Sequence, residues 1–282
     1  MDFNKPEAEI VLISQDATEQ NLNKTTDLCI AAHQDDIEIM AYGAISACLN
    51  DAQREFVGAV VSNGGGSPRG GIYANYSDSQ MKAVRKEEQK NAARIGGYFA
   101  QTFLEFESNE IKDPQNSAVA QDIEKLLLIC KPTTVYTHNL ADKHDTHVSV
   151  ALRVIEALRR LPEESRPKKI YSMEVWRGLD WLCDEDKTLF DTSRQPDIAA
   201  ELIGVFESQI ADGKRYDLAA IGRRMANATF FDSHSVDVSD SISFGLDITA
   251  LAYDENLSPE TFIRKYIERF EKDVSERILR LI

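Results

Sequence analysis

The residues best suited to chemistry follow the first strongly apolar run of the chain. His33 and Asp36 stand three residues apart, with Asp35 between them. A neutral imidazole and a carboxylate can bind one divalent cation together, and both are ligands that zinc accepts. Asp35 would then be free to act as a base beside the metal. The same spacing also fits a short polar turn in which an aspartate caps the following helix.

A second polar cluster lies in the middle of the chain. It comprises three histidines and two aspartates within ten residues: His138, Asp142, His144, Asp145 and His147. The helix that follows has an apolar inner face, so His144 and His147 could face one cleft from its N-terminal end. The alternative is that Asp145 or Thr146 only caps this helix while the histidines are solvated.

The elements that must position these clusters alternate between apolar strands and helices. Strands are predicted at Asp27–Ala32, Phe56–Val61, Thr102–Phe106, Thr133–Thr137 and Lys169–Val175. Helices are predicted at Asp36–Asn50, Ser77–Ile95, Ser117–Cys130 and Thr146–Leu161. This alternation predicts an α/β, Rossmann-like fold with a mostly parallel sheet and helices on both faces. Ligands bind beyond the carboxyl ends of the strands in such sheets, and both clusters follow strands that can be neighbours.

The pattern is looser after residue 175. Helices are predicted at Asp197–Ala211 and Asp217–Ala226, a strand at Ile242–Asp247, and a last helix from Ser258 to Ile282. We therefore expect a single domain over residues 1–282. Its core, residues 1–175, carries both polar clusters, and residues 176–282 form a C-terminal α+β elaboration.

Composition excludes several classes of protein. The 282 residues include 32 Lys and Arg against 47 Asp and Glu, a formal net charge of −15, which argues against a nucleic-acid binder. Neither a secretory leader nor an apolar run of about 18 residues is evident, so we expect no membrane span. The cysteines (Cys29, Cys48, Cys130 and Cys183) form no C-x-x-C pair and are expected to be buried, reduced thiols. A cytoplasmic protein is expected.

Three segments together resemble one enzyme family. The run Ala32–Asp36 (AHQDD) resembles the A-H-P-D-D-E motif of the PIG-L/LmbE-like zinc-dependent N-deacetylases, and His144–His147 (HDTH) resembles their second motif, H-P-D-H. Between them, Arg85–Gly96 is similar to the family's R-x-x-E-x-x-x-A-x-x-L-G helix. The resemblance covers roughly Asp27 to Leu161.

The resemblance implies a catalytic mechanism and a role for each motif residue. His33, Asp36 and His147 would be zinc ligands, leaving a fourth position open. Asp35 would be the general base, and His144 would stabilise or protonate the transition state. The implied reaction removes an N-acetyl group from an amino sugar or glycoconjugate with metal-activated water.

The chain departs from the family motifs at several positions. Gln34 replaces the usual proline, and Ile37 replaces the usual glutamate, although Glu38 follows directly. In the second motif, Asp145 and Thr146 stand where proline and aspartate are expected. The sequence therefore leaves open which group orients His144.

Other residues are candidates for substrate contact. Arg69 lies in a glycine-rich loop, residues 64–71. This loop could cover the metal and contact substrate, or it could be only a mobile connection. Arg85 could instead pair with a buried carboxylate. Trp176 and Arg177 could contact a sugar ring, although tryptophan is equally at home in a core. His234 could contact substrate or simply lie on the surface.

Rival functions remain open from the sequence. The same scaffold could cleave another amide, or use iron or manganese in the same site. A non-catalytic carbohydrate-binding relative could also retain the cleft, although it would not need Asp35 beside a metal. A nucleotide-binding module is disfavoured because the glycine-rich loop lacks the required spacing. A homo-oligomer is possible.

Overall fold

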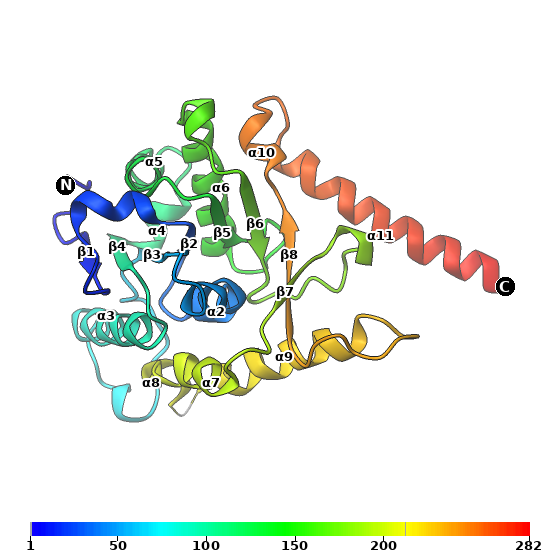
Figure 1. Ribbon diagram of the computed structural model, residues 1–282, viewed down its shortest axis with the longest axis horizontal. Helices are drawn as coiled ribbons and strands as arrows, with labels where there is room; N and C mark the ends of the chain where they lie inside the picture. The colour runs from blue at the N-terminus through cyan, green and yellow to red at the C-terminus, as the bar shows by residue number, and fades with distance from the viewer. Residues whose placement is uncertain (1, 212) are drawn as a thin grey trace.

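The sheet is the central element of the computed structural model, which describes residues 2–211 and 213–282. Eight strands are ordered β1-β4-β3-β2-β5-β6-β8-β7 (Figure 1). They are β1 (Glu9–Leu12), β2 (Asp27–Ala31), β3 (Phe56–Ser62), β4 (Ala100–Phe106), β5 (Thr134–His138), β6 (Lys169–Met173), β7 (Thr188–Asp191) and β8 (Ile242–Asp247). The five central strands are parallel, and β1, β7 and β8 pair antiparallel at the edges. The predicted α/β, mostly parallel fold is confirmed.

Helices cover both faces of this sheet. They are α1 (Asp36–Met40), α2 (Tyr42–Leu49), α3 (Asp78–Ile95), α4 (Ser108–Lys112), α5 (Ala118–Cys130), α6 (Asp145–Arg160), α7 (Pro196–Gly204), α8 (Glu207–Ile210), α9 (Tyr216–Phe230), α10 (Ala250–Tyr253) and α11 (Pro259–Leu281). Leu28 and Ile30 of β2 join a core with α5 and α6, whereas Cys29 and Ala31 join a second core with α1, α2, α3 and α7. Because successive side chains of a strand face opposite sides, one strand feeds both cores.

The strand order places the two polar clusters together. The chain passes from β2 to β3 and β4 on one side, and then returns to β5 on the other side of β2. Asp27 and Cys29 of β2 are paired with Thr134 and Tyr136 of β5. The carboxyl ends of β2 and β5 are therefore neighbours at the point where the strand order reverses, which is the preferred binding position in such sheets.

Two predicted helices are interrupted in the structure. The helix expected at Asp36–Asn50 breaks at Ala41, where Arg224 of α9 donates to the carbonyl oxygens of Glu38 (2.6 Å) and Ile39 (3.1 Å). These carbonyls lie at the break, so the guanidinium replaces partners that a continuous helix would supply. The helix expected at Asp197–Ala211 is likewise divided into α7 and α8.

The second helix break is centred on a buried aromatic side chain. Phe206 lies between α7 and α8 and is buried in the core, outside the helical conformation. Glu88 of α3 then accepts hydrogen bonds from the backbone (2.7 Å) and the hydroxyl (2.6 Å) of Ser208. Glu88 thereby fixes α8 beside α3.

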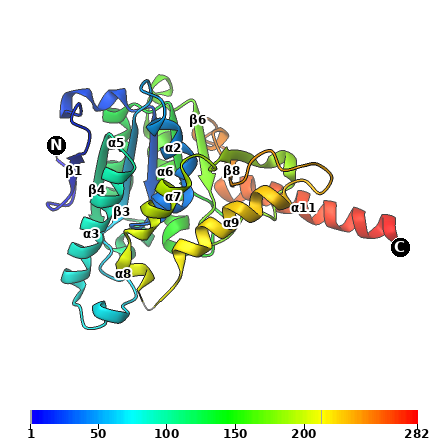
Figure 2. The same cartoon turned by 60° about the horizontal axis from the view of Figure 1, so that its bottom comes forward.

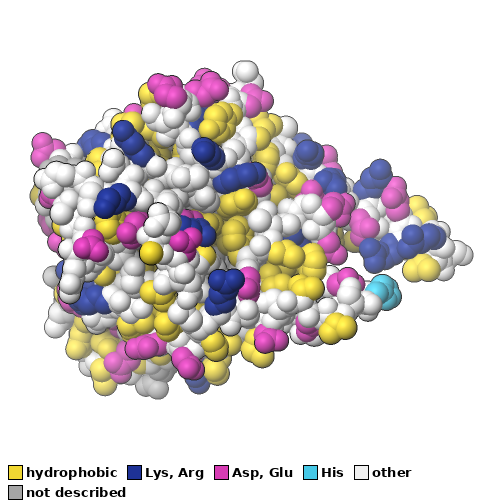
Figure 3. Space-filling model, viewed as in Figure 1, with side chains coloured by type: hydrophobic (Ala, Val, Ile, Leu, Met, Phe, Trp, Pro, Cys, Tyr) yellow, Lys and Arg dark blue, Asp and Glu magenta, His cyan; other side chains and the backbone are white. Residues whose placement is uncertain are grey.

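The C-terminal residues extend the same sheet and then leave the body of the protein. β8 pairs with β6, and β7 pairs with β8. Helix α11 projects away from the sheet (Figures 1 and 2). Its acidic and basic side chains lie side by side (Figure 3), and Arg277 pairs with Asp273 at 3.1 Å. Among the described residues no helix has the length and apolarity needed to span a bilayer.

The cysteines show no disulfide among the described residues. Cys29, Cys48 and Cys130 are buried and Cys183 is half-buried, and all are free. Burial raises the pKa of the Cys130 thiol to about 12, so this group stays protonated. The expectation of buried thiols holds for these first three cysteines.

Candidate metal centre

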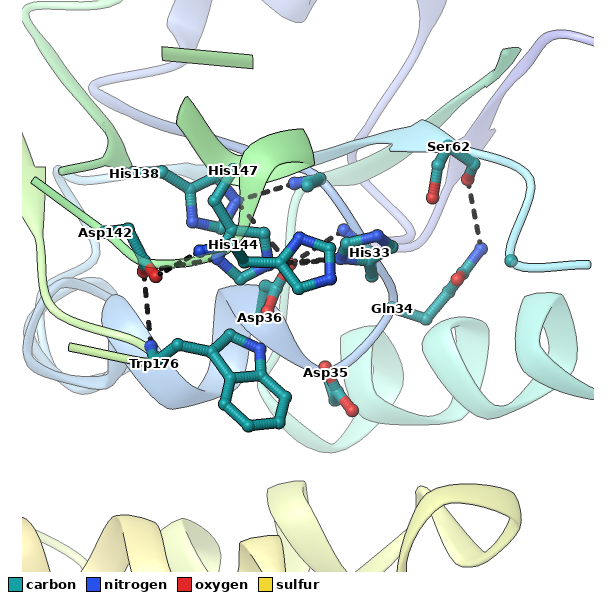
Figure 4. A network of polar contacts seen from close by, with 12 residues as sticks. His33, Gln34, Asp35, Asp36, Ser62, His138, Asp142, His144, His147 and Trp176 are labelled. Atoms are coloured by element: carbon teal, nitrogen blue, oxygen red, sulfur yellow. Dashed lines mark hydrogen bonds and ion pairs between the residues drawn. The ribbon is translucent and has the colours of Figure 1, made fainter. Parts of the chain in front are cut away.

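Three ligand atoms from the two clusters meet at one point. Nδ1 of His33 lies 3.1 Å from Nε2 of His147 and 3.2 Å from Oδ2 of Asp36, and the last two atoms are 3.2 Å apart. Tetrahedral zinc with bonds of about 2.0 Å separates its ligand atoms by about 3.3 Å. The triangle formed by His33, Asp36 and His147, called the triad below, therefore has the dimensions of one face of a zinc site (Figure 4).

A tight turn after β2 sets the first half of the triad. The backbone N–H of His33 donates to Oδ2 of Asp36 at 2.8 Å, which holds the carboxylate back over the turn. Asp35 between them has φ of 86°, a conformation that residues other than glycine rarely adopt. Such strain is found at functional sites, where the surrounding structure enforces it.

Asp142 fixes the other half of the triad. His147 lies in the first turn of α6, and its Nδ1 is 3.3 Å from Oδ2 of Asp142. Asp142 also accepts the backbone N–H groups of His144 (3.1 Å) and Trp176 (3.2 Å). A carboxylate behind a ligating histidine orients its ring and selects its tautomer. Here it turns Nε2 of His147 toward His33 and Asp36.

The charges of the triad match a cation site. Burial alone would raise the pKa of Asp36, but His147, His138 and His33 hold it well below its usual range. Burial lowers the pKa of His33. Burial opposes protonation of His147 as well, yet the carboxylates of Asp36 and Asp142 raise its pKa to about 9. A cation seated in the triad would replace this proton as the counter-charge.

His138 packs against the triad on its buried side. It ends β5, is fully buried, and its ring stacks on that of His147 with centroids 3.9 Å apart. Its Nε2 lies 3.5 Å from Oδ2 of Asp36 but accepts the backbone N–H of Ala32 at 2.7 Å. Because that lone pair is already used, His138 is less suited than His33 to bind a cation together with His147.

Asp35 and Arg85 form a buried ion pair beside the triad. Nη2 of Arg85 lies 3.5 Å from Oδ2 of Asp35, and both side chains line the cavity above the triad. Arg85 also donates to the carbonyl oxygen of Gln34 at 2.5 Å and to the hydroxyl of Ser67. Burial raises the pKa of Asp35 well above its usual range, against the effect of Arg85. A carboxylate with a raised pKa suits proton transfer.

His144 lies next to the two histidines of the triad. Its ring centroid is 5.0 Å from that of His33 and 4.5 Å from that of His147, and it stacks on Trp176 at 6.2 Å. Burial, with His147 and His33, lowers the pKa of His144 to about 4, so the ring is neutral at pH 7. Its Nδ1 is buried and has no hydrogen-bond partner within the described chain. Asp142 thus contacts the ring of His147, not that of His144.

The residues that depart from the family motifs have structural roles. Ile37 is part of the core. Glu38 points into the interior and accepts from Gln89 (2.7 Å) and the hydroxyl of Tyr98 (2.7 Å), so it does not replace the glutamate missing at position 37. Gln34 packs beneath the glycine-rich loop, where a Cβ at Gly64 would lie 2.6 Å from its Oε1.

A cavity of about 1010 Å³ opens above the triad. Its floor holds His33, Asp36 and His144, and its lining includes residues that follow the carboxyl ends of β3, β4 and β6. A volume of this size accommodates a disaccharide or a larger conjugate. The cavity therefore lies where a parallel sheet places its ligand.

The predicted substrate contacts divide into two groups. Arg85 and Trp176 line the cavity. In the part of the chain that is described, the lining does not include Arg69, Arg177 or His234. Arg69 forms an ion pair with a carboxylate of α3, and Arg177 and His234 are exposed.

Helix α9 supplies a further wall of the cavity. Tyr216, Ala220 and Arg223 share one face of this helix and line the cavity, together with Lys214 just before it. Tyr216 contacts Trp176 edge to face at 5.9 Å. The helical spacing of these residues is visible in the sequence, but only the pairing of β6 with β8 shows that α9 faces the site.

A model of one known protein family matches the part of the chain that carries the site. The model of the PIG-L family, described as GlcNAc-PI de-N-acetylase, matches residues 28–158. That range includes the triad, Asp35 and His144. None of the curated proteins matches the chain in sequence.

Solved structures share the fold at low sequence identity. N,N'-diacetylchitobiose deacetylase from Pyrococcus horikoshii is similar with a TM-score of 0.64 and 19% identity, over 84% of this chain and 89% of that one. A conserved protein from Thermus thermophilus gives 0.61 and 18%, over 79% and 94%. A 4-carboxy-2-hydroxymuconate hydratase from Pseudomonas putida gives 0.61 and 18%, over 79% and 96%. The family match therefore confirms the resemblance of residues 28–158 to the PIG-L family, and the solved structures show that the fold is shared.

Proposed function

We propose that this protein is a zinc-dependent hydrolase that removes an N-acetyl group from an amino sugar or glycoconjugate. The observation that carries the proposal is the triad of His33, Asp36 and His147, of which His33 and Asp36 line the floor of a cavity together with Asp35 and His144. The family match and the fold shared with a diacetylchitobiose deacetylase support the same conclusion.

His33, Asp36 and His147 would hold the cation through two nitrogens and one oxygen. Three protein ligands are the usual number for a catalytic zinc, since the fourth position must stay open for water or substrate. When bound, zinc supplies a Lewis acid for the amide carbonyl and lowers the pKa of a water molecule toward about 7.

Asp35 accepts the proton of the attacking water in this proposal. Its carboxylate lies in the cavity beside the triad without belonging to it, and Arg85 holds it from behind. The raised pKa of Asp35 allows it to take the proton and then pass it to the departing amine. Its backbone strain is consistent with a position fixed by the surrounding turn.

His144 stabilises the oxygen that becomes negatively charged. As a neutral ring beside His33 and His147 it can donate an N–H to that oxygen. Hydrogen-bond donation fits this ring better than full protonation, because its pKa of about 4 keeps it neutral at pH 7.

We propose further that residues 1–282 act as one domain. The wall of the cavity opposite the triad comes from α9, and β8 and β7 complete the sheet. The first 175 residues alone would leave the cavity open on that side. A cytoplasmic location and a homo-oligomer stay predictions.

The test combines metal content with amine release. Purified protein should bind about one zinc per chain and release free amine from N-acetylglucosamine conjugates. Asp35→Ala should keep the metal and lose at least about 100-fold in turnover, whereas His147→Ala should lose the metal. Full zinc content without release from any conjugate would favour a carbohydrate-binding relative. Amine release that survives chelation would exclude metal catalysis.

A further inference from the structure

The cavity wall away from the triad carries unpaired positive charge. Lys214, just before α9, and Arg223 on α9 line it, and within the described residues neither of them forms an ion pair with a carboxylate. Arg215 beside them is different, because it is bound through two hydrogen bonds to Asp217. Free cations on one wall are unusual in a chain whose formal net charge is −15.

The acidic side chains of the cavity do not cancel this charge. Asp35 faces Arg85, and Glu107 accepts from Lys82 at 2.7 Å. Asp36 belongs to the triad, whose cation would balance it. The wall formed by Lys214 and α9 therefore has a positive potential. The low dielectric of a cavity strengthens the attraction of an anion to it.

Both cations converge on one segment after β6. The guanidinium of Arg223 donates through Nη1 to the carbonyl oxygen of Val175, and Nζ of Lys214 lies 3.9 Å from the ring centroid of Trp176. The ring of Trp176 also stacks on that of His144, with centroids 6.2 Å apart. Trp176 thus contacts both Lys214 and His144.

Both cations keep hydrogen-bond donors for a ligand. Arg223 uses Nη1 for Val175, and the rest of its planar fork has no protein partner within the described chain. Among residues 2–211 and 213–282, the ammonium of Lys214 contacts only an aromatic face, which leaves its N–H groups free to donate. A guanidinium fork beside an ammonium matches the oxygens of a carboxylate or a phosphate.

We propose that Arg223 and Lys214 bind an anionic group of the substrate, a carboxylate or a phosphate, while its N-acetyl amide lies at the triad. This inference rests on the proposed deacetylase function and narrows it: the substrates are acidic N-acetylated sugars or conjugates. Trp176 supports the ring that joins the two ends of such a substrate.

Matched substrates test the proposal. The zinc-loaded full chain is assayed with methyl N-acetylglucosaminide, N-acetylglucosamine 1-phosphate and an N-acetylglucosaminide with a carboxylate aglycone. We expect kcat/KM to be at least about tenfold higher for one or both anionic substrates. The better anion identifies the group that the site takes.

Arg223→Gln and Lys214→Met should reduce this preference for the anionic substrate about tenfold, mainly through KM. Lys168→Met, an exposed lysine remote from the cavity, should leave the preference unchanged.

The possible outcomes separate the anion site from the function. Equal kcat/KM for neutral and anionic substrates would overturn the anion site and leave the deacetylase intact. If no substrate is hydrolysed, the proposed function fails, and tryptophan fluorescence titrations with the same compounds decide the site. Tighter binding of an anionic compound that Arg223→Gln weakens would sustain the site, and equal binding of all compounds would overturn it.

Discussion

Replacing Asp142 by asparagine should weaken zinc binding while leaving the fold intact. The Asp142 carboxylate contacts Nδ1 of His147 at 3.3 Å and accepts the backbone N–H groups of His144 and Trp176. Loss of an orienting carboxylate behind a ligand typically lowers metal affinity about 10- to 100-fold, or roughly 1.4–2.8 kcal/mol. The two backbone N–H groups donate to different oxygens of Asp142, so asparagine keeps an acceptor for one of them, and the free energy of unfolding without zinc should fall by about 1–3 kcal/mol for the other.

Alanine at the same position separates the two roles of Asp142. Asp142→Ala leaves the N–H groups of His144 and Trp176 without an acceptor, at about 1–3 kcal/mol each. It should therefore lower zinc affinity and cost stability for both N–H groups, whereas Asp142→Asn lowers zinc affinity and costs stability for only one of them. Zinc affinity is measured by competition with a chelating dye, and stability by urea unfolding of the metal-free protein.

Asp145→Asn is the matched control for this pair. Asp145 undergoes the same chemical change three residues further on, but it is exposed and outside the Asp142 network. Its zinc affinity should equal that of the wild type within about twofold. An unchanged affinity for Asp142→Asn, or an equal loss for Asp145→Asn, would refute the orienting role.

Two further substitutions test how the loops around the site are held. Gly64→Ala should lower the free energy of unfolding by roughly 1–3 kcal/mol. The reason is that Gly64 has φ of 73° and that a Cβ there would lie 2.6 Å from Oε1 of Gln34. Gly66→Ala is the control, because nothing lies within 4 Å of a Cβ at that position. Equal urea midpoints for the two glycine variants would contradict this. Arg224→Met should cost roughly 2–3 kcal/mol, because the carbonyls at the α1–α2 break lose their guanidinium donor; an unchanged urea midpoint would show that the break does not depend on Arg224.

The central fold could be predicted because its strands are strongly apolar. β2 and β3 are buried along their whole length, so their sequences contain few polar residues. β1 and β7 are short and only partly buried, and their sequences lack this signal. The break at Ala41 depends on Arg224, which is distant in sequence. Local periodicity cannot report such a contact.

The candidate site was predictable only in part. The meeting of His33, Asp36 and His147 follows from two motifs at the ends of neighbouring parallel strands. Asp142 lies two residues before His144 and five before His147, and this spacing does not show which imidazole its carboxylate contacts. That contact depends on how the short loop before α6 folds. The role of α9 depends on the C-terminal strands, which carry it back to the cavity.

Anomalous diffraction at the zinc edge from crystals of the zinc-loaded protein tests the central claim most directly. One strong peak should lie about 2.0–2.2 Å from Nδ1 of His33, Oδ2 of Asp36 and Nε2 of His147. Asp35 should remain outside bonding distance of that peak. A zinc bound elsewhere, or a peak at this position that lacks His147 as a ligand, would contradict the account.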